Sequence, residues 1–301
     1  MATKVVIQVA GPTAVGKTAM AIQLATWLNT EIISFDSRQC YKELNIGVAR
    51  PSSNELAAIP HHFIASHSIH EPVDAVVFAT YAKQKLNQLF EKHSIVVMVG
   101  GTGLYWKAFY EGLDEIPAIE PGLRQQIMHE YEQKGLSWLQ EELAQKDPAF
   151  AQAGEMKNPQ RMMRALEVIL TTGKSIFSFR KNSASTTDFE LISVGLELPR
   201  AILIERIHTR VVQMMEQGLL DEVKQLQTYS TLNALQTVGY QELFAHLSGV
   251  LSINQAIEQI QINTRQYAKR QMTWFKRQAE LNWFAPDQFE AIQQFVGEKL
   301  N

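Results

Sequence analysis

The chain has little of several features that mark particular classes of protein. It contains one cysteine, Cys40, among 301 residues, which excludes an internal disulfide and a zinc site built from cysteines. No apolar run is long enough to span a bilayer and no signal peptide is apparent, so we expect a cytoplasmic protein with no membrane partner. The 28 Lys and Arg are outnumbered by 31 Asp and Glu, so any nucleic-acid partner must bind to local basic patches rather than to bulk charge.

One segment matches the consensus of a phosphate-binding loop completely. Residues 11–18 read G-P-T-A-V-G-K-T, between an apolar strand predicted at Val5–Ala10 and a helix predicted at Ala19–Leu28. This context points backbone N–H groups and a helix N-terminus at an anion, which an ordinary Gly-rich turn does not do. We predict that the loop binds a polyphosphate or diphosphate through Gly11, Pro12, Thr13, Ala14, Val15, Gly16, Lys17 and Thr18. Lys17 reaches the outer phosphates, and Thr18 holds Mg²⁺.

The remaining pattern predicts a two-part chain. Apolar strands without alternation are expected at Glu31–Phe35, Ile95–Val99 and Phe189–Leu196, which is typical of a parallel sheet covered on both faces. Between them, residues 116–189 carry helical stretches punctuated by prolines and no convincing strand. We therefore predict an α/β fold, a P-loop NTPase-like core with a parallel sheet (residues 1–115 and 190–301), plus a helical insertion domain (residues 116–189). Further helices are expected at 123–134, 159–170, 200–217 and from 253 to about 280.

Phosphate-loop enzymes usually carry a second acidic residue at the end of an apolar strand, where it helps to hold Mg²⁺. The strand at Ile95–Val99 ends in glycines, and the available carboxylate is Asp36, after the second predicted strand. In a parallel sheet the ends of these strands meet the phosphate loop in one crevice. Asp36 is therefore either a general base or a group that orders a magnesium-bound water, or else an N-cap of the next helix, and the residues alone leave these open.

Two further motifs have a plain explanation beside a functional one. Gly100–Tyr105 lacks the third glycine of a dinucleotide fingerprint, so we reject NAD and expect close backbone approach to a substrate, with Thr102 offering its hydroxyl. Four histidines crowd a short stretch, but their spacing fits no zinc motif, and a loop with incidental histidines is favoured; they are His61, His62, His67 and His70.

Basic residues gather at two places in the second half of the chain. Arg206 and Arg210 lie one helical turn apart; a solvated helix face is the simpler interpretation, and a cation opposite Lys17 is the functional one. Residues 264–277 carry five Lys and Arg interleaved with aromatic residues and no carboxylate. This pattern is typical of a surface that binds an RNA backbone. It is also typical of a helix that packs its aromatic residues in the core and exposes its basic residues, and both interpretations can hold at once.

Taken together, the motifs resemble one family, the bacterial tRNA dimethylallyltransferases, also called tRNA isopentenyltransferases. The resemblance spans nearly the whole chain and rests on the order and spacing of eight segments: 11–18, D-S-R-Q-C-Y at 36–41, I-G-V-A-R-P at 46–51, P-H-H-F at 60–63, G-G-T-G-L-Y at 100–105, N-P-Q-R-M-M-R-A-L-E-V at 158–168, V-G-Y-Q-E at 238–242 and R-Q-Y-A-K-R-Q-M-T-W-F at 265–275.

The resemblance implies transfer of a dimethylallyl group from dimethylallyl diphosphate to N6 of the adenosine 3′ of the anticodon in tRNA. It implies Asp36 as the general base, Thr102 as the residue that orients the amino group, and Arg210 with Lys17 on the diphosphate. It places the anticodon stem-loop against the helical insertion, in a protein expected to be a monomer with Mg²⁺. The residues it implies in tRNA contact are Asp36, Ser37, Arg38, Gln39, Thr102, Arg124, Gln160, Arg161, Met162, Met163, Arg164, Lys269 and Arg270.

The segment around residues 45–50 departs from the family pattern. Arg50 stands where Lys is frequent, Val48 replaces Thr, Asn45 replaces Asp, and Cys40 occupies an aliphatic position. None of these removes a proposed catalytic group. Three alternatives stay open at this point: an isopentenyltransferase acting on free AMP, ADP or ATP, a small-molecule kinase, and a non-catalytic RNA-binding module.

Overall fold

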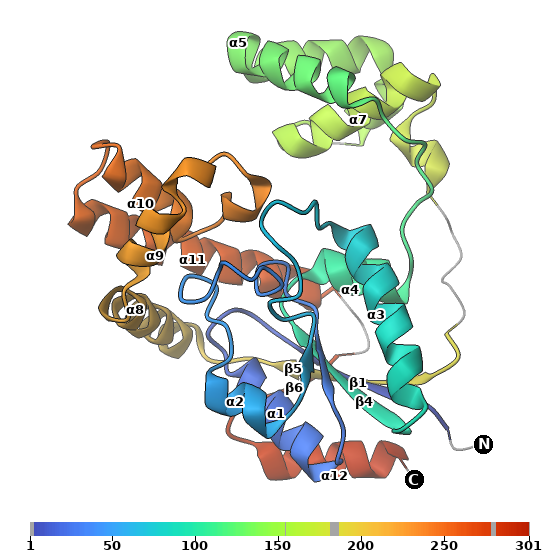
Figure 1. Cartoon of the computed structure of the whole chain (residues 1–301). Coiled ribbons are helices and arrows are strands. Elements are labelled where there is room, and N and C mark those ends of the chain that lie inside the picture. Colours follow the sequence, from blue (N-terminus) through green and yellow to red (C-terminus); the bar gives the residue numbers. More distant parts are fainter. Residues whose placement is uncertain (1–2, 154, 181–186, 278–280, 301) are drawn as a thin grey trace. The chain divides into compact units, whose positions relative to one another are not determined.

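The computed structural model describes residues 3–153, 155–180, 187–277 and 281–300. The chain divides into two compact units, one formed by Met1–Glu111 with Thr186–Asn301 and the other by Gly112–Ser185 (Figure 1). Each unit has its own apolar core. The larger one carries the phosphate loop.

The larger unit is built on a six-stranded sheet in which every strand pairing is parallel. The strand order is β3-β2-β4-β1-β5-β6, with bounds β1 Val5–Ala10, β2 Ile32–Ser34, β3 His61–His62, β4 Ile95–Gly100, β5 Glu190–Leu196 and β6 Asn282–Phe284. All six residues of β1 are buried, because β1 is central and both faces of the sheet are covered. The predicted α/β class and parallel sheet are confirmed, and the sequence prediction missed the short strands β3 and β6.

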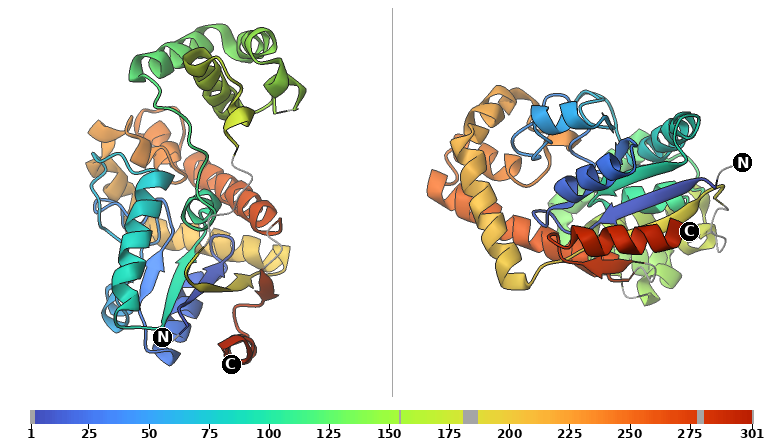
Figure 2. Two further views of the ribbon diagram at one scale, coloured as in Figure 1. Left: turned by 90° about the vertical axis from the view of Figure 1, so that its right-hand side faces the viewer. Right: turned by 90° about the horizontal axis from the view of Figure 1, so that it is seen from below.

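Helices cover both faces of this sheet. On one face α1 (Lys17–Trp27) and α12 (Phe289–Leu300) lie side by side and bury alternate residues of β1 and β5 (Figure 2). On the other, α3 (Ala75–Phe90) packs on α4 (Gly103–Tyr110) through a stacked aromatic pair, Phe78 and Tyr105. The phosphate loop therefore leaves a rigid, buried strand and enters a helix anchored in the core.

The last third of the larger unit adds helices that border the carboxyl ends of the strands. They are α8 (Arg200–Glu216), α9 (Leu219–Gln225), α10 (Tyr240–Leu247) and α11 (Ile253–Phe275), with the small α2 (Ser53–Ala58) near the loop after β2. Helix α11 packs against α8, α10 and α4. It ends at Phe275, and the predicted helix end near residue 280 falls outside the described residues.

The smaller unit consists, in its described residues, of helices and turns without a strand. Helix α5 (Pro121–Lys146) is interrupted at Gly135, whose φ of 76° and ψ of −167° are not helical. Helices α6 (Pro148–Gln152) and α7 (Pro159–Thr172) begin with proline, and a 3₁₀ turn follows at Ile176–Phe179. Their apolar faces close a separate core.

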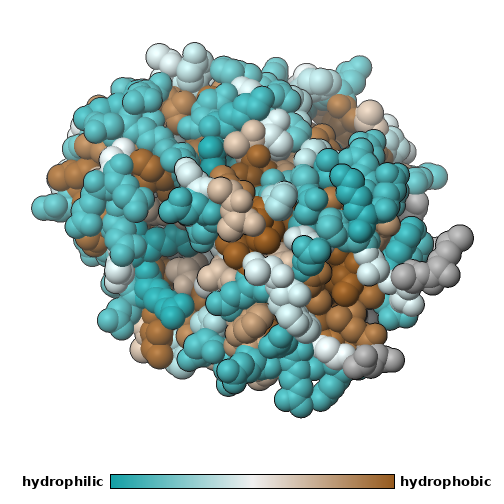
Figure 3. Space-filling model, turned by 60° about the horizontal axis from the view of Figure 1, so that its bottom comes forward, coloured by the Kyte–Doolittle hydropathy of each residue, from teal (hydrophilic) through white to brown (hydrophobic). Residues whose placement is uncertain are grey.

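None of the helices in the described part of the chain combines the length and hydrophobicity of a membrane span. On the face drawn in Figure 3, hydrophilic residues separate the hydrophobic patches from one another.

Candidate active site

The phosphate loop has the conformation that its sequence predicts. Gly16, the N-cap of α1, has a φ of 110°, and Ala14 has a φ of 64°, so the loop turns tightly through two left-handed residues before the helix begins. Gly11 is required by close approach as well, because a Cβ there would lie 2.6 Å from the carbonyl oxygen of Leu196 on β5. The Lys17 ammonium donates to the carbonyl oxygen of Pro12 at 2.8 Å, which folds the side chain back over the loop.

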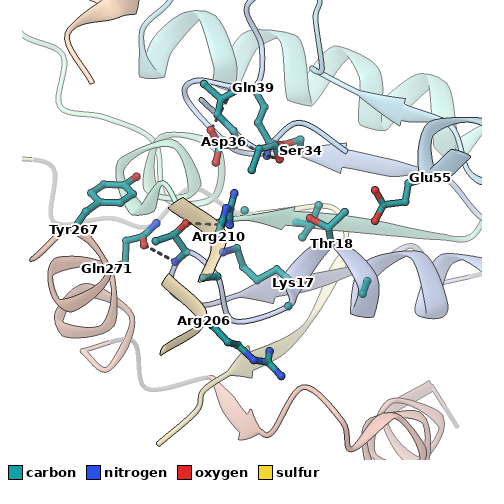
Figure 4. A pocket seen from close by; sticks show the side chains of 18 of the residues that line it. Lys17, Thr18, Ser34, Asp36, Gln39, Glu55, Arg206, Arg210, Tyr267 and Gln271 are labelled. Atoms are coloured by element: carbon teal, nitrogen blue, oxygen red, sulfur yellow. Dashed lines mark hydrogen bonds between the residues drawn. The ribbon is translucent and has the colours of Figure 1, made fainter. Parts of the chain in front are cut away.

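A cavity of about 370 Å³ opens beside this loop (Figure 4). Its polar walls come from five parts of the chain: the loop and α1, the end of β2 with the residues after it, α2, α8, and α11. The side chains that bring charge or hydroxyl groups to it are Thr13, Lys17, Thr18, Ser34, Asp36, Glu55, Arg206, Arg210 and Tyr267. The phosphate loop and Asp36 therefore share the crevice predicted at the carboxyl ends of the parallel strands, whereas Thr102, which was predicted to share it, is not among the residues that line this cavity.

Two cations and one carboxylate face each other in this cavity. Burial lowers the pKa of Lys17 to about 8; the Asp36 carboxylate raises it, and the Arg210 guanidinium lowers it further. Burial also lowers the pKa of Arg210, against the effect of Asp36. Arg210 reaches the loop itself, with its Nη1 3.5 Å from Thr13 Oγ1. Two crowded, poorly hydrated cations favour a multiply charged anion between them.

Asp36 is held in a turn rather than at a helix. Its Oδ1 accepts backbone N–H groups of Arg38 at 2.8 Å and Gln39 at 3.2 Å. The alternative of a helix N-cap is wrong, because residues 37–40 form turns and no helix starts there. The turn leaves Asp36 lining both the cavity beside the phosphate loop and a neighbouring cavity of about 360 Å³.

Thr102 is oriented by the same turn. Its hydroxyl accepts the N–H of Ser37 at 3.1 Å and donates to the Ser37 hydroxyl at 3.3 Å. On the other side Tyr267 interacts with Thr102; burial and the Asp36 charge raise the pKa of Tyr267 to about 12, so its phenol stays protonated at neutral pH. The predicted pair Asp36 and Thr102 is therefore brought together, with Tyr267 as an added neighbour.

Residues able to hold Mg²⁺ lie along the wall next to Lys17. Thr18 and Ser34 bring hydroxyls, and Asp36 and Glu55 bring carboxylates, to the same cavity. Oxygen donors of this kind fit a hard divalent cation that keeps several waters and shares a phosphate. The four histidines singled out in the sequence form no such site: in the described ranges no three His, Cys, Asp or Glu converge on a metal position. His62 instead pairs with Glu31 at 2.6 Å.

Several predicted tRNA contacts already have partners within the protein. Arg38 donates to the carbonyl oxygens of Asn233, Ala234 and Gln236, and the Gln39 amide donates to those of Val48 and Ala49. These bonds organise the rim of the cavity.

In the smaller unit, all three predicted arginines pair with glutamates. Arg124 and Arg164 pair with Glu167, which is 3% exposed, and Arg161 pairs with Glu155. Met162 and Met163 are 0% and 6% exposed and belong to the core of that unit, so their side chains offer no surface to RNA. Gln160, Lys269 and Arg270 are not buried.

The segment that departs from the family pattern is fully anchored. Glu222 on α9 accepts the backbone N–H groups of Asn45, Ile46 and Gly47. The Arg50 guanidinium donates to the carbonyl oxygens of Tyr41, Lys42 and Leu44. A single arginine therefore holds this loop through several hydrogen bonds at once.

Sequence reasoning missed Tyr267 and Gln271 as site residues. Both lie on the inner face of α11, one turn apart, and Gln271 bonds directly to the phosphate loop. Their helical spacing was visible, but the face they turn to was not, because it depends on how α11 packs.

The chain matches known proteins along nearly its full length. Residues 39–278 match the family model described as IPP transferase. A tRNA dimethylallyltransferase of Christiangramia forsetii is 43% identical over 296 residues, covering 98% of both chains. Another, of Cytophaga hutchinsonii, is 43% identical over 297 residues, covering 99% of this chain and 98% of the relative.

Solved structures agree with these relatives. The full-length tRNA isopentenylpyrophosphate transferase of Bacillus halodurans superposes with a TM-score of 0.73 at 33% identity, covering 99% of this chain and 97% of that one. A eukaryotic dimethylallyltransferase acting on tRNA gives a TM-score of 0.77 at 26% identity, covering 99% and 77%.

Proposed function

Because the chain belongs to the IPP transferase family and is a tRNA dimethylallyltransferase that prenylates the adenosine next to the anticodon, we propose a role for each group in its cavity. The observation that carries the proposal is the convergence of one carboxylate, Asp36, with two cations, Lys17 and Arg210, between the phosphate loop and α8.

The phosphate loop binds the diphosphate of dimethylallyl diphosphate. Lys17 and Arg210 approach it from different elements, and the start of α1 adds the partial positive charge of a helix N-terminus. In the reaction the allylic C–O bond breaks, and diphosphate leaves with the electron pair. The two cations stabilise the charge that develops on this leaving group.

The acceptor amino group approaches from the side of Asp36 and Thr102. Its nitrogen forms the new bond to the allylic carbon and loses a proton, which Asp36 accepts through the carboxylate oxygen that does not accept the turn N–H groups. Thr102, held by Ser37, orients the amino group. The adenosine must leave its stack to reach this position, which costs least in an unpaired loop.

Mg²⁺ is assigned to the wall formed by Thr18, Ser34 and Glu55. When bound, it neutralises part of the diphosphate charge. Thr18 is the residue that the phosphate-loop motif assigns to this ion.

The tRNA surface is assigned to two places. In the larger unit, Lys269 and Arg270 present an exposed basic face of α11. In the smaller unit, Gln160 and Arg161 at the start of α7 contact the anticodon stem-loop, with Arg124 and Arg164 shared between Glu167 and RNA. The protein acts as a cytoplasmic monomer.

Replacing the proposed base tests the chemistry. Asp36→Asn keeps the shape and one acceptor for the turn, and Asp36→Ala removes both; each should lower single-turnover transfer by about two or more orders of magnitude while tRNA affinity changes little. The assay follows labelled dimethylallyl diphosphate into tRNA, AMP or ATP. Near-normal transfer by both variants would remove Asp36 as the base, and label in free nucleotide would replace tRNA as the acceptor.

A further inference from the structure

One buried side chain ties the phosphate loop to the acceptor side of the site. Gln271 on α11 is 7% exposed. Its Oε1 accepts the backbone N–H of Thr13 at 2.8 Å (Figure 4), and its Nε2 donates to the carbonyl oxygen of Gly101 at 2.9 Å. Thr13 belongs to the phosphate loop, and Gly101 immediately precedes Thr102. A single amide therefore bridges the two loops.

Only an amide performs this task. A carboxylate lacks the donor, and an aliphatic side chain of the same size lacks both groups, so it would leave the Thr13 N–H and the buried Gly101 carbonyl without this partner. Asparagine has the amide, but its side chain is one methylene too short to reach both loops.

The neighbouring backbone is shaped around this amide. A Cβ on Gly101 would lie 2.2 Å from Gln271 Nε2, so glycine at that position leaves the room that the side chain occupies. Thr13 is held from a second direction as well, since its hydroxyl faces Arg210 of α8. Thr13, near the start of the phosphate loop, is thus held by two helices: by Arg210 of α8 and by the Gln271 amide of α11.

The same helix faces the acceptor. Tyr267, one turn before Gln271, interacts with Thr102 and lines both cavities, and the next positions outward, Lys269 and Arg270, are exposed. The Arg270 guanidinium lies 5.9 Å from the centre of the Tyr267 ring. One helix therefore carries the outward basic face and the inward contacts to both loops.

We propose that Gln271 is a positioning residue that fixes the distance between the phosphate loop and Thr102, and so holds the allylic carbon of the donor in line with the amino group oriented by Thr102. This inference rests on the proposed roles of the loop and of Thr102. Gln271 touches neither reacting atom; it acts through Thr13 and Gly101.

The test compares Gln271→Leu with Gln266→Leu, a matched change at a glutamine of the same helix that is not buried. With both substrates saturating, kcat of Gln271→Leu should fall about tenfold to a hundredfold, because small misplacements of reacting groups cost rates of this order. Inorganic diphosphate should bind more weakly by calorimetry. The affinity of Gln271→Leu for tRNA should stay within about twofold of the parent protein, and so should the kcat of the control variant Gln266→Leu.

A second variant probes the bridge from its other end. Gly101→Ala pushes Gln271 Nε2 away without removing the amide, so it should lower kcat in the same way, and the double variant should be no slower than Gln271→Leu alone. Should Gln271→Leu fail to fold, Gln271→Asn and Gly101→Ala are judged by the same criteria.

The outcomes separate this inference from the proposed chemistry. Folded Gln271 and Gly101 variants with kcat and diphosphate affinity equal to the Gln266→Leu control would overturn it. If Asp36→Asn in the same assay is inactive, only the positioning role is lost; if Asp36→Asn is active, the proposed base is wrong whatever Gln271 does.

Discussion

At the scale of single residues, the site separates side chains that sequence alone treats as equivalent. Arg206 and Arg210 lie one turn apart on α8, yet only Arg210 reaches the Thr13 hydroxyl, whereas Arg206 is exposed and donates to the carbonyl oxygen of Val15. In Figure 4 the Arg206 side chain points away from Asp36, and Arg210 lies between Lys17 and Asp36. We therefore propose the phosphate-binding role for Arg210 and not for Arg206.

This difference predicts unequal effects of two identical substitutions. Arg210→Ala should raise the KM for dimethylallyl diphosphate and lower kcat together by about tenfold to a hundredfold, because it removes a charge-assisted hydrogen bond worth ~1.5–3 kcal/mol. Arg206→Ala should change both constants by less than about fivefold, because its guanidinium is exposed to water and donates to the Val15 carbonyl oxygen of the loop. Steady-state kinetics on the two variants, with tRNA affinity measured alongside, decides the assignment. Equal donor kinetics in both variants would contradict it.

The low pKa of Lys17 predicts a pH dependence of donor capture. Lys17 binds diphosphate as a cation, and with a pKa of about 8 in the free protein this cation is lost as the pH rises through about 8. The kcat/KM for the donor should therefore fall above that pH. Lys17→Arg stays charged over the whole range and should lack this decline, even if its plateau is lower. Superimposable profile shapes would show that another group is titrating.

At the scale of elements, α11 has both a packed face and a basic face, as the sequence allowed. Phe275 and Ala268 are buried in the core, whereas Lys269 and Arg270 are exposed. The helix is therefore both a packed element and a basic surface, because a helix that packs along one side leaves the other side in water.

Removing the exposed charges of α11 should weaken tRNA binding through its salt-dependent part. For Lys269→Ala with Arg270→Ala, the slope of log affinity against log salt should become shallower by ~0.7–0.9 for each phosphate that the protein no longer neutralises. A matched pair, Lys83→Ala with Lys92→Ala, removes two exposed lysines on and just after α3 and should leave the slope unchanged. If both pairs behave like the parent protein, tRNA does not bind to this face.

The arginines of α7 give the companion measurement. Arg161→Ala removes one exposed cation, which pairs with Glu155. Arg164→Ala removes one of the two ion pairs of the buried Glu167, so that Arg124 remains as its partner. The double variant should also show a shallower slope, and its thermal stability should be recorded, because an underpaired buried carboxylate destabilises the unit.

At the scale of the whole molecule, the two units have separate apolar cores, so one unit can unfold while the other stays folded. Leu139 is 0% exposed in the core of the smaller unit, and among the described residues the cores of the two units share no member. Stability of the two units need not be lost together.

A cavity in the smaller core should therefore disturb tRNA binding and spare the donor site. Leu139→Ala should cost that unit ~2–5 kcal/mol. Hydrogen exchange should show lower protection in α5 and α7, with protection in β1 and α1 and calorimetric affinity for inorganic diphosphate unchanged. Parallel loss of diphosphate binding would mean that the units unfold as one.

The sequence by itself determined the class of the protein and the chemistry of its loop. A buried strand, a complete phosphate motif and an apolar helix are local patterns, so Gly11–Thr18 and the parallel sheet were predictable. Asp36 and Thr102 were predictable as neighbours too, because parallel strands bring their carboxyl ends to one edge.

Only the tertiary structure decided which side chains meet across long separations. Gln271 reaches Thr13 over 258 positions, Arg210 reaches it over 197, and Glu222 anchors residues 45–47 from α9. These contacts depend on the angle at which α8, α9 and α11 pack on the core, and a helical period fixes which residues share a face but not what that face meets. The same reason explains Met162 and Met163, which are buried in a core that their motif did not reveal.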